Sequence, residues 1–201
     1  MKRIAVSLLL FFFVSGAFAQ KYSLVSGDLS PLKGMKQFVF AFEYENMTVG
    51  KKSEEVYVSE KVADYNKKEP GRGDQWKAAW VGDRASRFEP AFIELFNKYG
   101  EEFSAHGDKA NAQAQCKITV KTVFTEPGYN IGISRADANI NVEYVFTLLS
   151  DPSKPVAVLS CSRIPGRVFL GNDYDTGVRI MEAYAKAGKS LVDYLEKPLW
   201  K

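Results

Sequence analysis

Residues 136–148 read ADANINVEYVFTL, and this stretch decides the fold. Polar and charged side chains alternate in it with apolar ones, and the apolar positions are Ala136, Ala138, Ile140, Val142, Tyr144, Phe146 and Leu148. Such an alternation, sustained over this length, is typical of a β-strand that has one face on the protein core and the other on solvent. The stretch therefore predicts a long, half-buried strand.

Three more strands are predicted around it. The segments 36–45 and 116–125 alternate in the same way, and an apolar run predicts a strand at 156–162. One face of the first of these carries four aromatic side chains, Phe38, Phe40, Phe42 and Tyr44, which we expect to anchor the core. The last three strands have short connections, so they should form an antiparallel meander. We expect an irregular lead-in at 20–34 and a turn at 106–108.

Helices are predicted where apolar residues recur every three and four positions. One helix should cover 74–99, with an interruption or a new start at Pro90, and another should run from about 176 to 197. A short, strongly charged helix fits 53–66. In the last helix, Arg179 lies outside the apolar stripe, so the pattern places it toward solvent.

The order of elements then defines the fold class. A strand is followed by a helix, three strands and a closing helix, and the long link between the first two strands suits a crossover. We expect an α+β fold: a two-layer sandwich with a mixed, four- to five-stranded sheet that contains an antiparallel meander and carries two main helices on one face. Residues 20–201 should form a single domain.

Residues 1–19 are typical of a cleavable export signal. Two basic residues precede an apolar run from Ile4 to Val14, and Ala17-Phe18-Ala19 matches the pattern that signal peptidase cleaves. The run is shorter than the roughly 20 residues that a membrane-spanning helix needs. We expect cleavage before Gln20, no membrane span afterwards, and a location in the periplasm or outside the cell.

Composition narrows the function classes. The chain of 201 residues has 27 basic and 24 acidic residues, and removal of 1–19 takes away two of the basic ones, which leaves a net charge of +1. We therefore expect no nucleic-acid partner. One histidine and two cysteines are too few for multi-histidine metal sites, cysteine-rich zinc sites or disulfide-dense scaffolds. No cofactor and no metal are expected.

The residues that could act in catalysis or bind a metal have ordinary structural interpretations here. Cys116 and Cys161 should lie on strands separated by a third strand, roughly 10 Å apart, which is beyond disulfide reach, so we expect two free, buried thiols. The lone His106 should be a surface residue. Asp173 and Asp175 precede the last helix, where capping is their expected role. A catalytic or calcium-binding role for this pair stays open.

Two turns carry large apolar residues where turns are usually polar. They are the hairpin tip with Tyr129, Ile131 and Ile133, and the loop with Val168, Phe169 and Leu170. Exposed apolar clusters mark surfaces that bind partners, so these six residues form the candidate partner surface. The alternative, in which each turn folds back on the core, stays open.

The layout from residue 74 to 197 resembles small, uncharacterised exported proteins of Gram-negative envelopes. It is also similar to the amino-terminal domain of the TolB periplasmic protein and to lipoproteins of envelope assembly systems. The strands 118–124 and 136–148 and the helix 178–195 carry this resemblance. It implies a compact two-layer domain and supplies no catalytic residues. Unlike the lipoproteins, this chain has no cysteine near the cleavage point.

These observations favour an exported, non-catalytic protein that binds an envelope protein partner or a ligand. The alternative is a periplasmic hydrolase with a carboxylate or serine site outside the known motifs, and a third hypothesis is adhesion through Arg72-Gly73-Asp74. A deep pocket with converging polar groups would favour the enzyme, whereas an apolar patch near the two turns would favour the binding protein. The oligomeric state is left open.

Overall fold

The computed structural model describes residues 20–168 and 174–201, and its central element is a mixed sheet of eight strands. Six of them follow the order β1-β10-β9-β6-β2-β5, while β3 pairs with β4 and β6. The α+β class is confirmed, but the sheet is larger than the four to five strands expected. The strands are β1 (Lys21–Gly27), β2 (Gln37–Glu43), β3 (Thr48–Val49), β4 (Lys52–Ser53), β5 (His106–Asp108), β6 (Cys116–Glu126), β9 (Ala138–Leu148) and β10 (Ala157–Gly166).

The predicted meander forms the centre of this sheet. Strands β6, β9 and β10 pair antiparallel in sequence order, and β2 pairs with β6 in parallel after a helical crossover. The alternation in β9 has the predicted effect, because Ile140, Tyr144 and Phe146 are all fully buried. The central strand β9 separates the two cysteines: Cys116 pairs with a residue of β9 from one side and Cys161 from the other. Both thiols are free and buried, as predicted.

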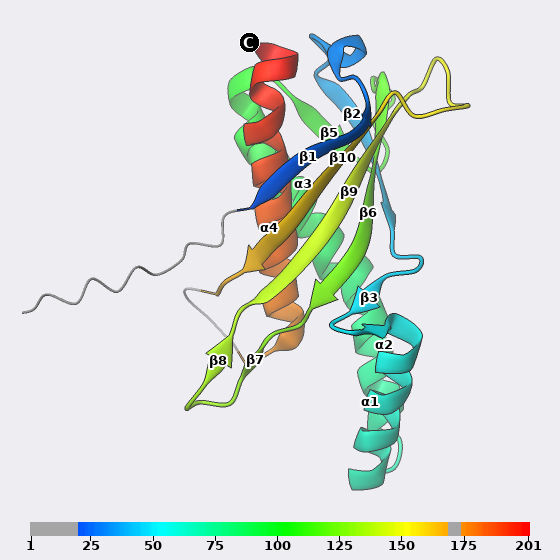
Figure 1. Ribbon diagram of the computed structural model, residues 1–201, viewed down its shortest axis with the longest axis vertical. Helices are drawn as coiled ribbons and strands as arrows, with labels where there is room; N and C mark the ends of the chain where they lie inside the picture. Colours follow the sequence, from blue (N-terminus) through cyan, green and yellow to red (C-terminus); the bar gives the residue numbers. More distant parts are fainter. Residues whose placement is uncertain (1–19, 169–173) are drawn as a thin grey trace, which may run out of the picture.

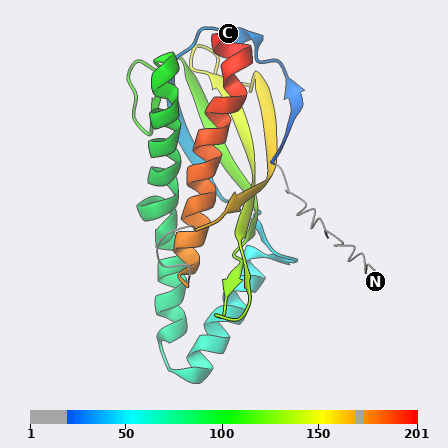
Figure 2. The ribbon, with the colours of Figure 1, turned by 90° about the vertical axis from the view of Figure 1, so that its left-hand side faces the viewer.

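Two long helical segments cover one face of the sheet (Figures 1 and 2). The first consists of α2 (Arg72–Asp83), a π-helical turn (Arg84–Phe88) and α3 (Glu89–Gly100), and the second is α4 (Thr176–Leu195), which ends in another π-helical turn (Glu196–Trp200). Pro90 lies in the first turn of α3, where its missing N–H is tolerated. The interruption expected there is thus a π turn immediately before it.

Aromatic packing joins α3 to the sheet. Phe40 makes edge-to-face contacts with Phe92 and Phe96, at ring-centroid distances of 5.2 and 4.9 Å. Between the helices, Gly188 of α4 allows close approach, since a Cβ there would lie 2.1 Å from the carbonyl oxygen of Phe92. At this position the close neighbour of α4 is therefore α3.

Several short elements differ from the sequence-based expectation. The segment 20–34, expected to be irregular, contains β1 and a 3-10 turn (Ser30–Leu32), and β5 occupies the segment 106–108, where a turn was expected. A further 3-10 turn (Glu101–Phe103) follows α3, and a two-stranded hairpin forms from β7 (Tyr129–Asn130) and β8 (Arg135–Ala136).

Helix α1 (Glu54–Lys68) pairs with α2 as a hairpin that extends beyond the sheet (Figure 1). Its backbone packs tightly against α2, since a Cβ on Gly73 would lie 2.3 Å from the carbonyl oxygen of Val62. The ring of Trp80 contacts Tyr57 and donates a hydrogen bond to Glu54. None of the helices in the described part of the chain is both long and apolar enough to cross a membrane.

Candidate functional site

The β7–β8 hairpin presents three large apolar side chains to solvent. Tyr129 is 47% exposed, Ile131 is 65% exposed and Ile133 is 96% exposed. The hairpin extends from the same end of the sheet as the α1–α2 hairpin, away from the core (Figures 1 and 2). These three residues do not fold back on the core, and we call them the apolar tip.

Hydrogen bonds within the turn give the apolar tip a defined shape. Gly132 has a φ of +84°, which glycine adopts without strain, and its N–H donates to the side chain of Asn130 at 2.8 Å. The N–H of Ile131 donates to the carbonyl oxygen of Ser134 at 3.0 Å. The backbone polar groups are thereby used inside the turn, so the apolar side chains are free to point outward.

Arg179 of α4 holds the base of this hairpin. Its Nε donates to the carbonyl oxygen of Pro127 at 3.2 Å, and one Nη donates to Gly128 at 3.4 Å and to Thr176 at 3.0 Å. The residue is only 3% exposed, which corrects the solvent-facing position expected from the helix pattern. A buried guanidinium needs such acceptors, because burial without partners would cost several kcal/mol. The hairpin is therefore fixed to the helix layer.

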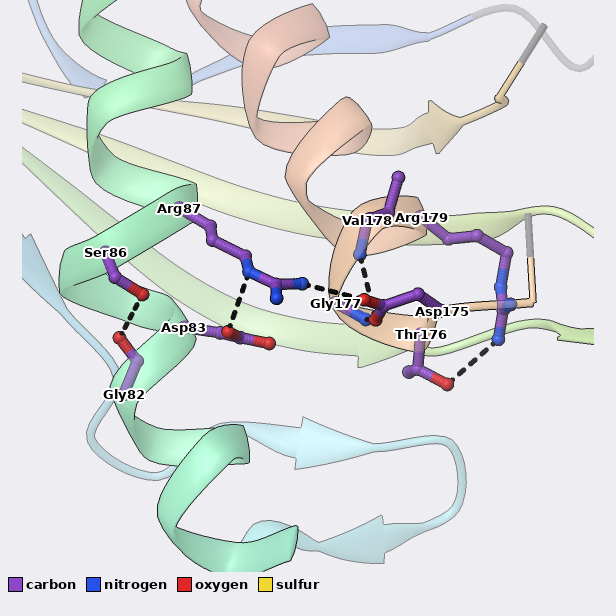
Figure 3. Close-up of polar contacts among 9 residues, drawn as sticks. All are labelled: Gly82, Asp83, Ser86, Arg87, Asp175, Thr176, Gly177, Val178 and Arg179. Atoms are coloured by element: carbon purple, nitrogen blue, oxygen red, sulfur yellow. Dashed lines mark hydrogen bonds and ion pairs between the residues drawn. The ribbon is translucent and has the colours of Figure 1, made fainter. Parts of the chain in front are cut away.

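A second arginine ties the start of α4 to the π turn before α3 (Figure 3). Arg87 contacts Asp83 with Nε at 3.1 Å and Asp175 with Nη1 at 3.0 Å. Asp175 is also the N-cap of α4 and accepts from the N–H groups of Gly177 and Val178. Capping by Asp175 is thus confirmed, and its carboxylate has an arginine partner that the sequence did not reveal.

The two carboxylates of this network have opposite pKa shifts. Burial raises the pKa of Asp83; the Asp175 carboxylate adds to the rise, and Arg87 opposes it. Burial would also raise the pKa of Asp175, but hydrogen bonds from Arg87 and from the backbone at Gly177 and Val178 outweigh it and lower the pKa. A Cβ on Gly177 would lie 2.2 Å from a carboxylate oxygen of Asp83, so a larger residue there would displace the Asp83 side chain. These contacts engage both acids in structural roles.

The second candidate loop does not extend the apolar tip. Val168 is only 7% exposed, so its assignment to an exposed partner surface is wrong, and a place in the protein interior accounts for its apolar side chain. Phe169, Leu170 and Asp173 lie outside the described residues. The candidate site that the structure supports therefore consists of Tyr129, Ile131 and Ile133.

In the structure, the other residues that could act in catalysis or bind a metal lie apart from one another. His106 lies on β5, at one edge of the sheet, whereas Ser190 of α4 contacts Tyr22 of β1, at the opposite edge, with a hydroxyl–hydroxyl distance of 2.8 Å. Burial raises the pKa of Cys116 to about 12 and that of Cys161 to about 11, which disfavours the thiolate. Within residues 20–168 and 174–201, no three acidic, histidine or cysteine side chains are grouped so as to hold a metal.

Comparison with known proteins gives only distant similarity. No protein-family model matches the chain, and no curated protein matches it. Two solved structures of the PelC dodecamer from Paraburkholderia phytofirmans, one of them a single-substitution variant, are 14% identical to it, with TM-scores of 0.42 and, for the variant, 0.43. Both comparisons cover 90% of this chain and nearly all of the PelC chain. At these values the likeness carries no conclusion about function or assembly.

Proposed function

We propose that this protein is an exported, non-catalytic binding protein that presents the apolar tip to a protein partner in the cell envelope. The observation that carries the proposal is the 96% exposure of Ile133 at the end of a hairpin whose base is held by Arg179. A large apolar side chain in that position contributes little to folding, because it buries almost no surface. Its burial in a partner would remove that surface from water.

The size of the apolar tip fits a small anchoring contact. Full burial of one isoleucine stabilises by about 1.5–3 kcal/mol, so Ile131 and Ile133 together could contribute several kcal/mol to binding. Tyr129 adds an aromatic side chain, the type that is enriched where binding energy is concentrated. A convex tip requires a partner with a complementary groove, which a folded protein can supply.

The hydrogen bonds of the turn also favour binding. A partner would meet a turn that is already ordered by Gly132 and Ser134, so little conformational entropy is lost on association. Hydrogen bonds from Arg179 to the carbonyl oxygens of Pro127 and Gly128 hold the base of the hairpin against α4. The contact surface is in this sense organised before binding.

Site-specific photocrosslinking in intact cells tests the proposal. A photoreactive amino acid at position 133 should give one discrete crosslinked protein. The matched control is Ser153, an exposed residue in the turn between β9 and β10, at the opposite end of the sheet (Figure 1). Equal crosslinking from both positions, or no crosslinked protein from position 133, would contradict a partner surface at the apolar tip.

A further inference from the structure

The outer edge of β1 is open. Among the described strands, β1 pairs only with β10, so its other edge carries backbone N–H and C=O groups without a neighbouring strand. Lys21 is its single charged residue, and Leu24 and Val25 are 44% and 58% exposed. The edges of natural sheets are usually protected by charged side chains, proline, bulges or very short strands. In β1 the only such features are Lys21 at its start and a bulge between Leu24 and Ser26.

A groove with a volume of about 500 Å³ is lined by residues at the start of this edge strand, by Pro165 of β10 and by one face of α4. Tyr22 and Tyr194 form an aromatic wall, with ring centroids 4.6 Å apart. The buried hydroxyl of Ser190 lies within 2.8 Å of the Tyr22 hydroxyl and accepts a hydrogen bond from Gln20 at 3.2 Å. The groove is therefore lined by two aromatic rings and by side-chain polar groups that are hydrogen-bonded to one another.

Two opposite charges lie along the α4 side of the groove. Lys186 and Asp193 both line it, and neither forms an ion pair with another residue in the described part of the chain. Seven helical positions separate them, which corresponds to an axial rise of about 10.5 Å. Side chains on one face of an extended strand recur every two residues, so positions four apart share a face and lie about 13 Å from each other.

We infer that this groove binds an extended peptide segment of a partner, which adds as a strand to the free edge of β1. The segment carries an acidic side chain near Lys186 and a basic side chain near Asp193, about four residues apart along the strand, so that both side chains face α4. Its backbone pairs with β1, and a side chain between the two charged groups packs against Tyr22 and Tyr194. This site is separate from the apolar tip and supplies a second mode of binding.

Selection from a displayed library of randomised octapeptides on the purified full chain tests the inference. We expect enriched peptides to share acidic and basic residues about four positions apart, so that both lie on one face of the strand. Lys186→Glu should weaken their binding by about tenfold, since it replaces an attraction by a repulsion. The double exchange Lys186→Glu/Asp193→Lys should select peptides with the two charges in reversed order.

Two controls make the outcome specific. Lys98→Glu reverses an exposed charge on α3, outside the groove, and should leave peptide binding unchanged, as should Ile133→Ser at the apolar tip. Hydrogen exchange should show new protection of alternate β1 amides within Lys21–Gly27, those that point away from β10, when the peptide is bound, because strand addition engages them.

Several results would overturn the inference. They are the absence of enriched peptides, enriched peptides that bind Lys186→Glu as well as the unaltered chain, and binding without new protection of β1. Self-association of the chain through β1, detected as a concentration-dependent mass in sedimentation that Lys186→Glu abolishes, would assign the edge to a second copy instead.

Discussion

Ile133 and Ile140 offer the sharpest test of the site, because they lie close in sequence and differ most in environment. Ile133 is 96% exposed at the apolar tip, whereas Ile140 is fully buried in β9. Truncation of a buried isoleucine to alanine costs about 2–5 kcal/mol, because it removes apolar contacts and leaves a cavity. We expect Ile140→Ala to cost that much and Ile133→Ala to change the free energy of unfolding by no more than about 0.5 kcal/mol.

The complete apolar tip can be treated in the same way. Tyr129 and Ile131 are 47% and 65% exposed, so each buries only part of its side chain in the folded protein. Together the three side chains bury about as much as one full side chain, so at about 1.5–3 kcal/mol for a fully buried side chain, their triple replacement by serine should cost about 1.5–3 kcal/mol in total. Three replacements at the tip should thus cost no more than a single truncation in the core.

Urea denaturation followed by tryptophan fluorescence measures these free energies, since Trp76 and Trp80 lie in α2. A loss above about 1.5 kcal/mol for Ile133→Ala would show that the tip packs on the core, and it would refute the reasoning. A loss below about 1 kcal/mol for Ile140→Ala would refute the register of β9, since a shift by one residue moves every side chain to the other face.

Three further predictions concern the framework around the site. Gly166→Ala should destabilise by about 1–3 kcal/mol, because its Cβ would lie 2.0 Å from the backbone carbonyl oxygen of Arg179. Gly82→Ala, in a helix and with open space around it, should stabilise by about 0.5–1 kcal/mol, and thermal unfolding compares the two. Cys116 and Cys161 should resist iodoacetamide at a mildly alkaline pH until the chain is unfolded, and intact mass should show both thiols reduced; rapid labelling of the folded protein would contradict their burial. The pKa of Asp175 is lower in the folded protein than in the unfolded chain, so its ionised carboxylate stabilises the fold above its usual pKa of about 3.9. This stabilisation is lost as the pH falls through the folded pKa. Asp175→Asn should therefore reduce the loss of stability at acid pH, and an unchanged loss would contradict the Arg87 contact.

The long strands could be predicted because only one face of each lies on the core, which makes apolar and polar residues alternate in their sequences. Strands β6 and β9 alternate over most of their length, and their inward positions are buried against the helices, so period two identifies them. The crossover from β2 to β6 followed from the length of the link. Strands β1 and β5 were missed because they lie at the sheet edges, where neighbouring strands fix the backbone while most side chains remain in solvent.

The apolar tip could be predicted from the local sequence alone, because turns usually consist of polar residues and this turn contains isoleucines. The supporting contacts were not predictable. The burial of Arg179 depends on the carbonyl oxygens of Pro127 and Gly128, which are distant in sequence. Helical periodicity assigns a charged residue to solvent and contains no information about acceptors on another element, and the same limit concealed the contact between Arg87 and Asp175.

Capture of the crosslinked partner by tip variants tests the central claim most directly. The partner identified from position 133 should be retained by the unaltered chain and by Leu149→Ser, which removes an exposed apolar side chain (44%) after β9. The double variant Ile131→Ser/Ile133→Ser should remain folded and lose at least about tenfold in affinity, which corresponds to about 1.4 kcal/mol. Equal affinity of the double variant and the unaltered chain would contradict the account.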